Sequence, residues 1–358
     1  MIVNQKKIIM PRPFVTQSGF VINSPEVCYE EYGNSNGEVV YIAHGGLSGP
    51  HAAGKYAEGD TAPGWWDPII GPDKAIDTNK YRVICANSLG SMFGSTGAAS
   101  INPNTGKRYG PEFPTLTLID MTLFIKMFLD HLGIESLYLM AGPSMGSLQS
   151  LQMAAQFPNF VENVVAVATA GRMPPSGMAM HHFIINAVKM DPEFKDGWYE
   201  EGEARHALRM IHQVAKIYYT HEKGIKSLCW DTVEEAEESQ QKRSSYVSNY
   251  LLASLEEDIA GRDPNSYITL TTAVNSFDLG IGAGSYKQGV RRIKCPVMLV
   301  NLDTDCEFAP EWAHELGDII NEANPGQCRV EILESDWGHL GCLREADDIA
   351  SLIKKFLY

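Results

Sequence analysis

The sequence contains no long apolar segment. Among its 358 residues, no run approaches the roughly 20 apolar residues that span a bilayer. The first residues include lysines but no apolar stretch of signal-peptide length. We therefore expect a cytoplasmic protein without a membrane partner.

Basic residues are scarce. The chain has 29 Lys and Arg against 44 Asp and Glu, which gives a formal net charge of −15. A surface with this charge opposes broad contact with phosphates, and the basic clusters are short pieces such as Arg291-Arg292-Ile293-Lys294. The balance excludes nucleic acid as an expected partner.

Paired cysteines and metal-binding spacings are also missing. The seven cysteines form no C-x-x-C pair and have no histidine at zinc-finger spacing, so we predict buried free thiols and no metal site. No dinucleotide fingerprint appears, and no tightly bound cofactor is expected. The cysteines are Cys28, Cys85, Cys229, Cys295, Cys306, Cys328 and Cys342.

Short apolar segments alternate with helical patterns. Such alternation predicts an α/β fold with a mainly parallel, doubly wound sheet. Strands are expected to begin near Val39, Tyr81, Ser136, Val164, Pro296 and Cys328. Helices are expected over 117–132, 145–157, 312–320 and 346–356.

The alternation stops between residues 171 and 289, where the sequence becomes methionine-rich, charged and mostly helical. Because the strand pattern resumes at Cys295, we interpret this segment as a helical cap inserted into one core domain. The predicted core comprises residues 1–170 and 290–358, and the predicted cap residues 171–289.

The stretch M-A-G-P-S-M-G-S-L-Q-S contains a candidate nucleophile, Ser144, in a G-x-S-x-G motif. The motif follows an apolar strand and opens a helical pattern, which is the setting of a nucleophile elbow. Glycine at 142 and 146 suits so sharp a turn, where a side chain would crowd the backbone.

A serine hydroxyl needs a base, and the base needs an orienting acid. His339, in S-D-W-G-H-L-G-C after the last strand, is the predicted base. D-T-D-C-E-F follows the preceding strand; Asp305 is the favoured acid, because Asp303 lies nearer the strand end and could serve the turn. Asp336 is a third candidate.

The oxyanion of the tetrahedral intermediate requires backbone N–H donors. Met145, directly after the nucleophile, is one expected donor. The second is Gly46 or Leu47 in the glycine loop H-G-G-L-S-G, and His44 at the start of that loop is expected to be structural.

Longer motifs identify a family resemblance. The chain resembles the homoserine O-acetyltransferase family of α/β-hydrolase-fold enzymes in H-A-A-G, in G-W-W-D-P-I-I-G-P-D-K-A-I-D-T-N-K-Y-R-V-I-C-A-N, in G-S-T-G-A-A-S-I-N-P-N-T-G-K-R-Y-G-P-E-F-P, and at all three catalytic loops. The resemblance covers nearly the whole chain apart from the divergent cap.

The resemblance implies a ping-pong mechanism, in which Ser144 takes an acetyl group from acetyl-CoA and passes it to homoserine. It supports Asp305 as the orienting acid and implies that Arg209 in the cap holds the carboxylate of the acceptor, which suits the guanidinium fork. It also implies a homodimer formed through the cap helices.

One departure from the family pattern concerns the base loop. Family transferases usually read G-H-D, where the aspartate helps bind the acceptor's amino group; this chain reads Gly338-His339-Leu340. Losing such a hydrogen bond costs a few kcal/mol, which is on the order of 10²-fold in acceptor selectivity. An acid elsewhere, such as Asp336 or one on the cap, could compensate.

Three functions therefore compete. The first is hydrolysis of short-chain acyl esters through acyl-Ser144, and the second is acetyl-CoA-dependent transfer to homoserine, serine or another alcohol. Both begin with the same acylation step. The third, a binding protein that has lost activity, conflicts with the complete triad and the glycine loop.

Overall fold

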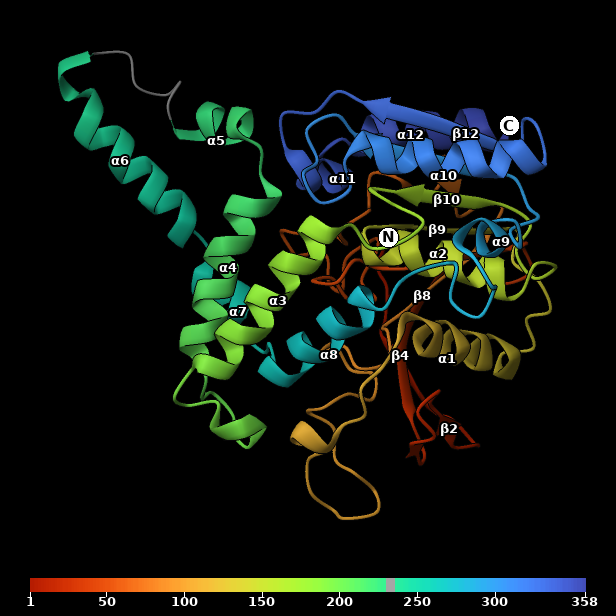
Figure 1. The fold of residues 1–358 in the computed structure, drawn as a ribbon, viewed down its shortest axis with the longest axis horizontal. Coiled ribbons are helices and arrows are strands. Elements are labelled where there is room, and N and C mark those ends of the chain that lie inside the picture. The colour runs from red at the N-terminus through yellow and green to blue at the C-terminus, as the bar shows by residue number, and fades with distance from the viewer. Residues whose placement is uncertain (230–235) are drawn as a thin grey trace.

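A central sheet of eight strands forms the core of the protein (Figure 1). The computed structural model describes residues 1–229 and 236–358, with side chains at all of these except 229 and 236–243. The strand order is β1-β4-β8-β5-β9-β10-β11-β12; β1 and β4 are antiparallel to their neighbours, and the pairs from β8 to β12 are parallel. The predicted mainly parallel sheet is confirmed.

Burial of both faces explains why the central strands show no alternation of apolar and polar residues. Strands β5, β9, β10 and β11 are buried almost throughout, as expected for parallel strands covered on both faces. The sheet comprises β1 (Lys6–Ile9), β4 (Glu26–Gly33), β5 (Val39–Ile42), β8 (Arg82–Ala86), β9 (Leu139–Pro143), β10 (Val164–Val167), β11 (Val297–Leu302) and β12 (Cys328–Leu333). Two small ladders pair β2 (Phe14–Val15) with β3 (Val21–Ile22) and β6 (Ile70–Gly71) with β7 (Ile76–Asp77).

The core helices pack on the sheet and on one another. Helix α1 (Leu118–His131) begins at a capping box, in which Thr117 and Asp120 satisfy each other's backbone N–H groups. Helix α2 (Met145–Gln156) packs on β9 and β10, and α10 (Pro310–Ala323) packs on β11 and β12. The other core helices are η1 (Gly110–Glu112), η3 (Gly338–Leu340), α11 (Gly341–Arg344) and α12 (Ala346–Leu357).

A group of helices gathers beside one side of the sheet (Figure 1). In the part of the chain that the structure describes, the elements between residues 175 and 275 are helices, and this group has a small apolar core of its own. The elements are α3 (Pro175–Met190), η2 (Lys195–Gly197), α4 (Arg205–Tyr219), α5 (Glu222–Cys229), α6 (Ala236–Leu252), α7 (Leu255–Ile259) and α8 (Pro264–Asn275). Helix α9 (Tyr286–Val290) lies apart from this group and packs on α10 (Figure 1). This is the segment interpreted as a cap; its exact boundaries stay a prediction.

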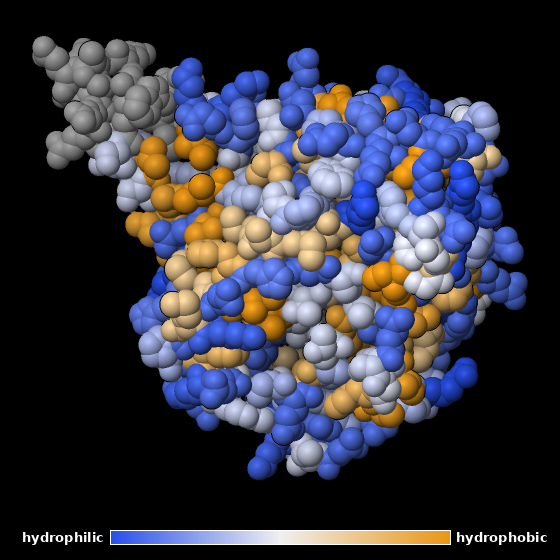
Figure 2. Space-filling model, viewed as in Figure 1, coloured by the Kyte–Doolittle hydropathy of each residue, from blue (hydrophilic) through white to orange (hydrophobic). Residues whose placement is uncertain are grey.

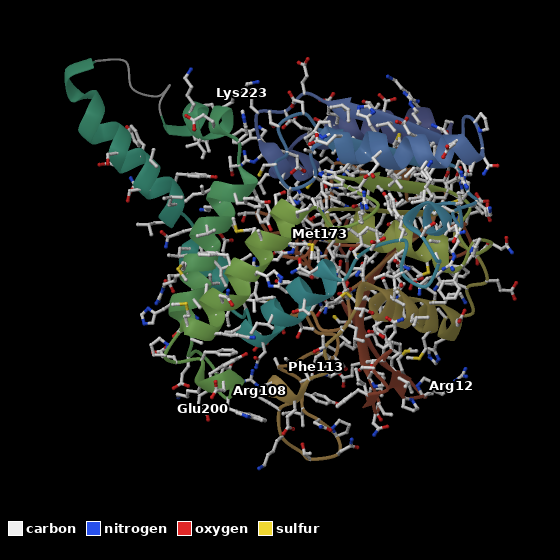
Figure 3. The ribbon with its side chains drawn as sticks, in the orientation of Figure 1. Arg12, Arg108, Phe113, Met173, Glu200 and Lys223 are labelled. Atoms are coloured by element: carbon white, nitrogen blue, oxygen red, sulfur yellow. The ribbon has the colours of Figure 1, made fainter. Side chains whose placement is uncertain are left out.

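Several contacts fasten the cap to the core. The segment before α3 and the segment after α8 are adjacent, because Arg172 and Asp278 form an antiparallel bridge. Arg108, labelled in Figure 3, reaches from a core loop to within 3.1 Å of Asp263, the residue that caps α8. Leu270, Ala273 and Val274 of α8 also belong to the main apolar core. The cap is therefore held over the sheet at several points.

The six cysteines whose side chains the structure describes are unpaired, but one departs from the prediction. Cys28, Cys85, Cys295, Cys328 and Cys342 are buried free thiols. Cys306 is exposed, which corrects the expectation of burial: it lies on the loop after β11, and its thiol contacts the Tyr218 carbonyl oxygen at 3.0 Å. The side chain of Cys229 lies outside the described residues. None of the described helices is long and apolar enough to cross a bilayer.

Candidate active site

Ser144 lies on a sharp turn between β9 and α2. Its backbone has φ 53° and ψ −126°, a strained conformation for a residue with a side chain. A Cβ atom at Gly142 or Gly146 would lie 2.2 or 2.0 Å from the carbonyl oxygen of Ala43. The flanking glycines are thus required because the end of β5 passes against the turn.

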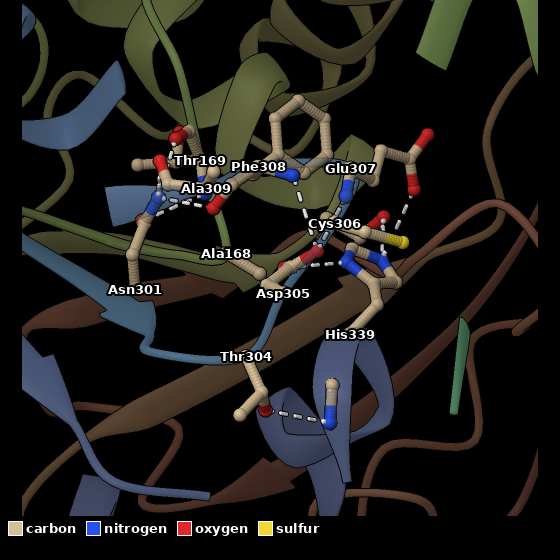
Figure 4. A network of polar contacts seen from close by, with 12 residues as sticks. Ala168, Thr169, Asn301, Thr304, Asp305, Cys306, Glu307, Phe308, Ala309 and His339 are labelled. Carbon is tan, nitrogen blue, oxygen red and sulfur yellow. Dashed lines mark hydrogen bonds and ion pairs between the residues drawn. The ribbon is translucent and has the colours of Figure 1, made fainter. Parts of the chain in front are cut away.

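A continuous hydrogen-bond chain joins the three predicted catalytic side chains. The Nε2 atom of His339 lies 2.9 Å from Ser144 Oγ, and its Nδ1 atom lies 2.8 Å from Asp305 Oδ2 (the latter contact is drawn in Figure 4). The other carboxylate oxygen of Asp305 accepts hydrogen bonds from the backbone N–H groups of Glu307 and Phe308, at 2.8 and 3.1 Å. This geometry fits a serine nucleophile with its base and orienting acid.

Neighbouring charges and burial shift the pKa values of His339 and Asp305 in opposite directions. Burial alone would lower the pKa of His339, but the carboxylates of Asp305 and Glu307 raise it to about 9. Burial would raise the pKa of Asp305, but His339 and the two backbone donors hold it below its usual range. The pair is therefore electrostatically suited to an imidazolium over an ionised aspartate.

The two competing acids lie elsewhere. Asp303 accepts a hydrogen bond from the backbone N–H of Ser335 at 2.8 Å, so it joins the loops after β11 and β12. Asp336 is exposed, and its carboxylate lies 3.5 Å from Nζ of Lys223, which Figure 3 labels at the upper end of the cap. Neither contacts the imidazole of His339, whereas Asp305 does.

The glycine loop lies beside the nucleophile, and His44 fixes it. Its Nδ1 atom contacts the Gly45 carbonyl oxygen at 2.8 Å, and its Nε2 atom accepts a hydrogen bond from the backbone N–H of Ser88 at 2.9 Å. Burial lowers the pKa of His44 to about 4, which favours the neutral ring that this pattern requires. His44 is thus a structural residue.

The predicted oxyanion donors line the same cavity as Ser144. Gly46, Leu47 and Met145 all contribute to its wall. Within the described ranges, no acceptor is bonded to the backbone N–H groups of these three residues. Their availability suits the binding of a developing oxyanion, and that role stays a prediction.

The cavity itself is small and mostly apolar. Its volume is about 140 Å³, and aliphatic and aromatic side chains from cap and core supply most of its wall. Leu340 is part of that wall, but no Lys or Arg is among the described residues that line it. Arg209 points elsewhere: its Nε atom lies 2.7 Å from Glu256 on the cap surface. The substrate-binding role predicted for Arg209 requires it to leave this partner.

Glu307 is the site residue that the sequence analysis missed. Its side chain is 3% exposed and lines the cavity, and Oε2 lies 3.6 Å from Nε2 of His339 (Figure 4). The feature of the sequence that could have identified Glu307 was its position two residues after Asp305. Nothing in D-T-D-C-E-F indicates that this glutamate turns inward.

Comparisons with known proteins agree with this architecture. A family model described as alpha/beta hydrolase fold matches residues 38–346. Together with the elbow and the hydrogen-bonded Ser, His and Asp, this match defines an enzyme of the α/β-hydrolase type.

Relatives that match over nearly the full length identify the family within this fold. Homoserine O-acetyltransferase of Moorella thermoacetica is 34% identical, with 95% of this chain and 92% of that protein covered. The enzyme of the same name from Deferribacter desulfuricans is 35% identical, with 99% and 96% covered. The chain belongs to the homoserine O-acetyltransferase family.

Solved structures with the same fold carry two different names. Homoserine O-acetyltransferase from Bacillus anthracis matches with a TM-score of 0.91 at 26% identity, covering 100% of this chain and 98% of that one. A crystal structure of an esterase matches with a TM-score of 0.90 at 30% identity, covering 100% of both chains. The same scaffold therefore occurs in proteins named for acyl transfer and for ester hydrolysis.

Proposed function

We propose that this protein hydrolyses short-chain carboxylic esters through an acyl-Ser144 intermediate. The observation that carries the proposal is the Ser144–His339–Asp305 hydrogen-bond chain opening into an apolar cavity. Ser144 Oγ attacks the ester carbonyl while His339 Nε2 takes its proton, and Asp305 stabilises the imidazolium. The leaving alcohol takes that proton, and water then repeats the sequence on the acyl-enzyme.

Backbone donors complete the mechanism. The N–H of Met145 and that of Gly46 or Leu47 are proposed to bind the oxyanion. Removing one such donor from a serine enzyme costs about 10²–10³-fold in kcat, so this contribution is large. The donors belong to fixed elements, the first turn of α2 and the loop held by His44, and need no reorganisation during the reaction.

The wall of the cavity supports water as the acyl acceptor. An amino-acid acceptor carries a carboxylate, which a buried site binds through a cation. The described lining residues include no cation, and Arg209 is engaged by Glu256. Leu340 offers no group that pairs with an ammonium. An uncharged acyl ester and water need neither partner.

A second candidate is acetyl transfer from acetyl-CoA to homoserine or a related alcohol. The names of the curated relatives favour this reading over ester hydrolysis. It uses the same acyl-Ser144 and differs only in what attacks the acyl group. For this function Arg209 would release Glu256 and turn toward the acceptor. The products formed from acetyl-CoA and homoserine separate the two candidates.

The acyl-serine step can be tested directly. Wild-type protein is expected to hydrolyse p-nitrophenyl acetate and to be labelled by a fluorophosphonate probe at Ser144. Ser144→Ala is expected to lose both, whereas Ser351→Ala, at an exposed serine on α12, keeps both. Unlabelled wild-type protein would contradict the proposal and favour a binding protein without catalytic activity.

We also propose a homodimer formed through the cap helices. Figure 2 shows apolar side chains gathered on the cap side of the molecule, and exposed apolar residues on α3 and α4 include Phe183, Met190, Met210 and Ile217. Burying such a patch against a second copy would remove it from water. Sedimentation equilibrium is expected to give about twice the 39.5 kDa chain mass; a monomer would contradict this.

A further inference from the structure

One buried carboxylate of the cavity has no place in the triad mechanism. Glu307 is carried by the same loop as Asp305, and its backbone N–H binds that acid. Its side chain, however, turns to the opposite edge of His339, so the imidazole lies between two carboxylates: Asp305 at Nδ1 and Glu307 beside Nε2. The Nε2 edge is the one that faces Ser144 and the substrate.

Cap residues hold the Glu307 carboxylate in place. Nε2 of His181, on α3, lies 3.2 Å from Glu307 Oε1, within ion-pair distance. Nδ1 of His181 in turn lies 2.7 Å from Oδ1 of Asn275, the last residue of α8. His181 and Glu307 are both buried, so residues of two cap helices pack against this carboxylate inside the site.

The second oxygen of this carboxylate is free to bind a molecule in the cavity. In the described part of the chain, Oε2 of Glu307 accepts no hydrogen bond from a protein donor, and Nε2 of His339 lies 3.6 Å from it. Because Glu307 lines the cavity, a group that enters beside His339 can donate an N–H or O–H to Oε2.

We infer that Glu307 orients the nucleophile that attacks acyl-Ser144, and that it favours nucleophiles with a second hydrogen-bond donor. This inference rests on the proposed acyl-enzyme. Once Ser144 is acylated, its oxygen no longer occupies Nε2 of His339. An incoming oxygen can lie about 2.8 Å from both Nε2 and Oε2, because those atoms are 3.6 Å apart.

Water satisfies both atoms. One of its O–H groups gives its proton to His339 Nε2 as the oxygen bonds to the acyl carbon, and the other O–H donates to Glu307 Oε2. The tetrahedral intermediate then breaks its bond to Ser144 Oγ, which takes the proton from Nε2, and the carboxylic acid leaves. No other reactant is needed.

Acceptors differ in whether they can supply the second hydrogen bond. A simple alcohol such as methanol has one O–H; when that proton goes to His339, Glu307 is left without a donor. A 1,2-diol or amino alcohol carries a second donor and meets both requirements. Glu307 therefore selects against simple alcohols and accepts water, diols and amino alcohols.

The test is the partition of one acyl-enzyme between two nucleophiles. Wild-type protein and Glu307→Gln are each acylated with p-nitrophenyl acetate in aqueous methanol, and acetate and methyl acetate are measured. Acylation rate, protonation of His339 and folded fraction cancel in the product ratio, because both nucleophiles attack the same intermediate through the same base. A merely structural role for Glu307 would therefore not move it.

Wild-type protein is expected to form mainly acetate. Glu307→Gln should raise the ratio of methyl acetate to acetate by about tenfold and slow deacylation by about 10²-fold, since a misplaced nucleophile costs that order. Slow deacylation will appear as a burst of about one p-nitrophenol per Ser144. Glu311→Gln, at an exposed glutamate at the start of α10, should keep the wild-type ratio.

Two outcomes overturn different claims. An unchanged product ratio in Glu307→Gln, with acetyl-Ser144 detected, would overturn the role of Glu307 alone. Absence of acetyl-Ser144 in wild-type protein would instead overturn the proposed function. If Glu307→Gln does not fold, His181→Asn keeps the carboxylate but removes the cap imidazole beside Oε1, and a smaller shift in the same direction is expected; no shift would again overturn the inference.

Discussion

Replacing Gly146 by alanine tests the geometry of the elbow without touching a catalytic side chain. The new Cβ would lie 2.0 Å from the Ala43 carbonyl oxygen and 2.6 Å from its carbon, whereas ordinary contacts begin at 3.4 Å. The end of β5 or the start of α2 must therefore move by roughly 1 Å. Because β5 leads into the glycine loop, the proposed oxyanion donors would shift relative to Ser144, and a displacement of this size costs about 10²-fold in rate.

The assay is kcat/KM for p-nitrophenyl acetate, measured together with thermal unfolding. Gly146→Ala is expected to remain folded at the assay temperature with kcat/KM about 10²-fold below wild type. Gly59→Ala is the matched control, since nothing lies within 4 Å of a Cβ atom placed there. Wild-type activity in Gly146→Ala would refute the claim that the approach of Ala43 dictates glycine at this position.

Three further predictions concern the base, the acid and the acceptor. Since a base must be unprotonated and carboxylates raise the pKa of His339 to about 9, kcat/KM should rise between pH 7 and pH 9 and level off above; a midpoint at or below the usual 6.5 would contradict the electrostatic account. Asp305→Asn should lower kcat by about 10⁴-fold, with Asp303→Asn close to wild type; equal losses would reject Asp305 as the orienting acid. Leu340→Asp should lower hydrolysis relative to transfer to homoserine, measured as the ratio of acetate to O-acetylhomoserine, and an unchanged ratio would mean that residue 340 does not govern acceptor choice.

The parallel part of the sheet could be predicted because its strands are continuous apolar segments. The segments expected near Val164 and Pro296 became β10 and β11. Strand β4 was not predicted, because E-V-C-Y-E-E-Y-G mixes charged and apolar residues. Its buried glutamate, Glu30, is stabilised by Tyr32 of the same strand and by His51 and Tyr56 from outside it. Its stability comes from tertiary contacts that sequence periodicity does not contain.

The candidate site was predictable where backbone topology decides it. Ser144, Asp305 and His339 each follow a strand of one sheet, so their loops meet at one edge. The inward turn of Glu307 depends instead on His181 in the cap, which is 126 residues earlier in the sequence. The outward position of Arg209 depends in the same way on its ion pair with Glu256. The positions of these side chains depend on packing between segments that are distant in the sequence.

The most direct test of the account is the fate of the acyl group on Ser144. The protein is supplied with p-nitrophenyl acetate or acetyl-CoA, each with and without homoserine, and acetate is resolved from O-acetylhomoserine. Ester hydrolysis predicts acetate as the main product from p-nitrophenyl acetate even when homoserine is present. Dominant formation of O-acetylhomoserine from acetyl-CoA would contradict it and assign the protein to acetyl transfer.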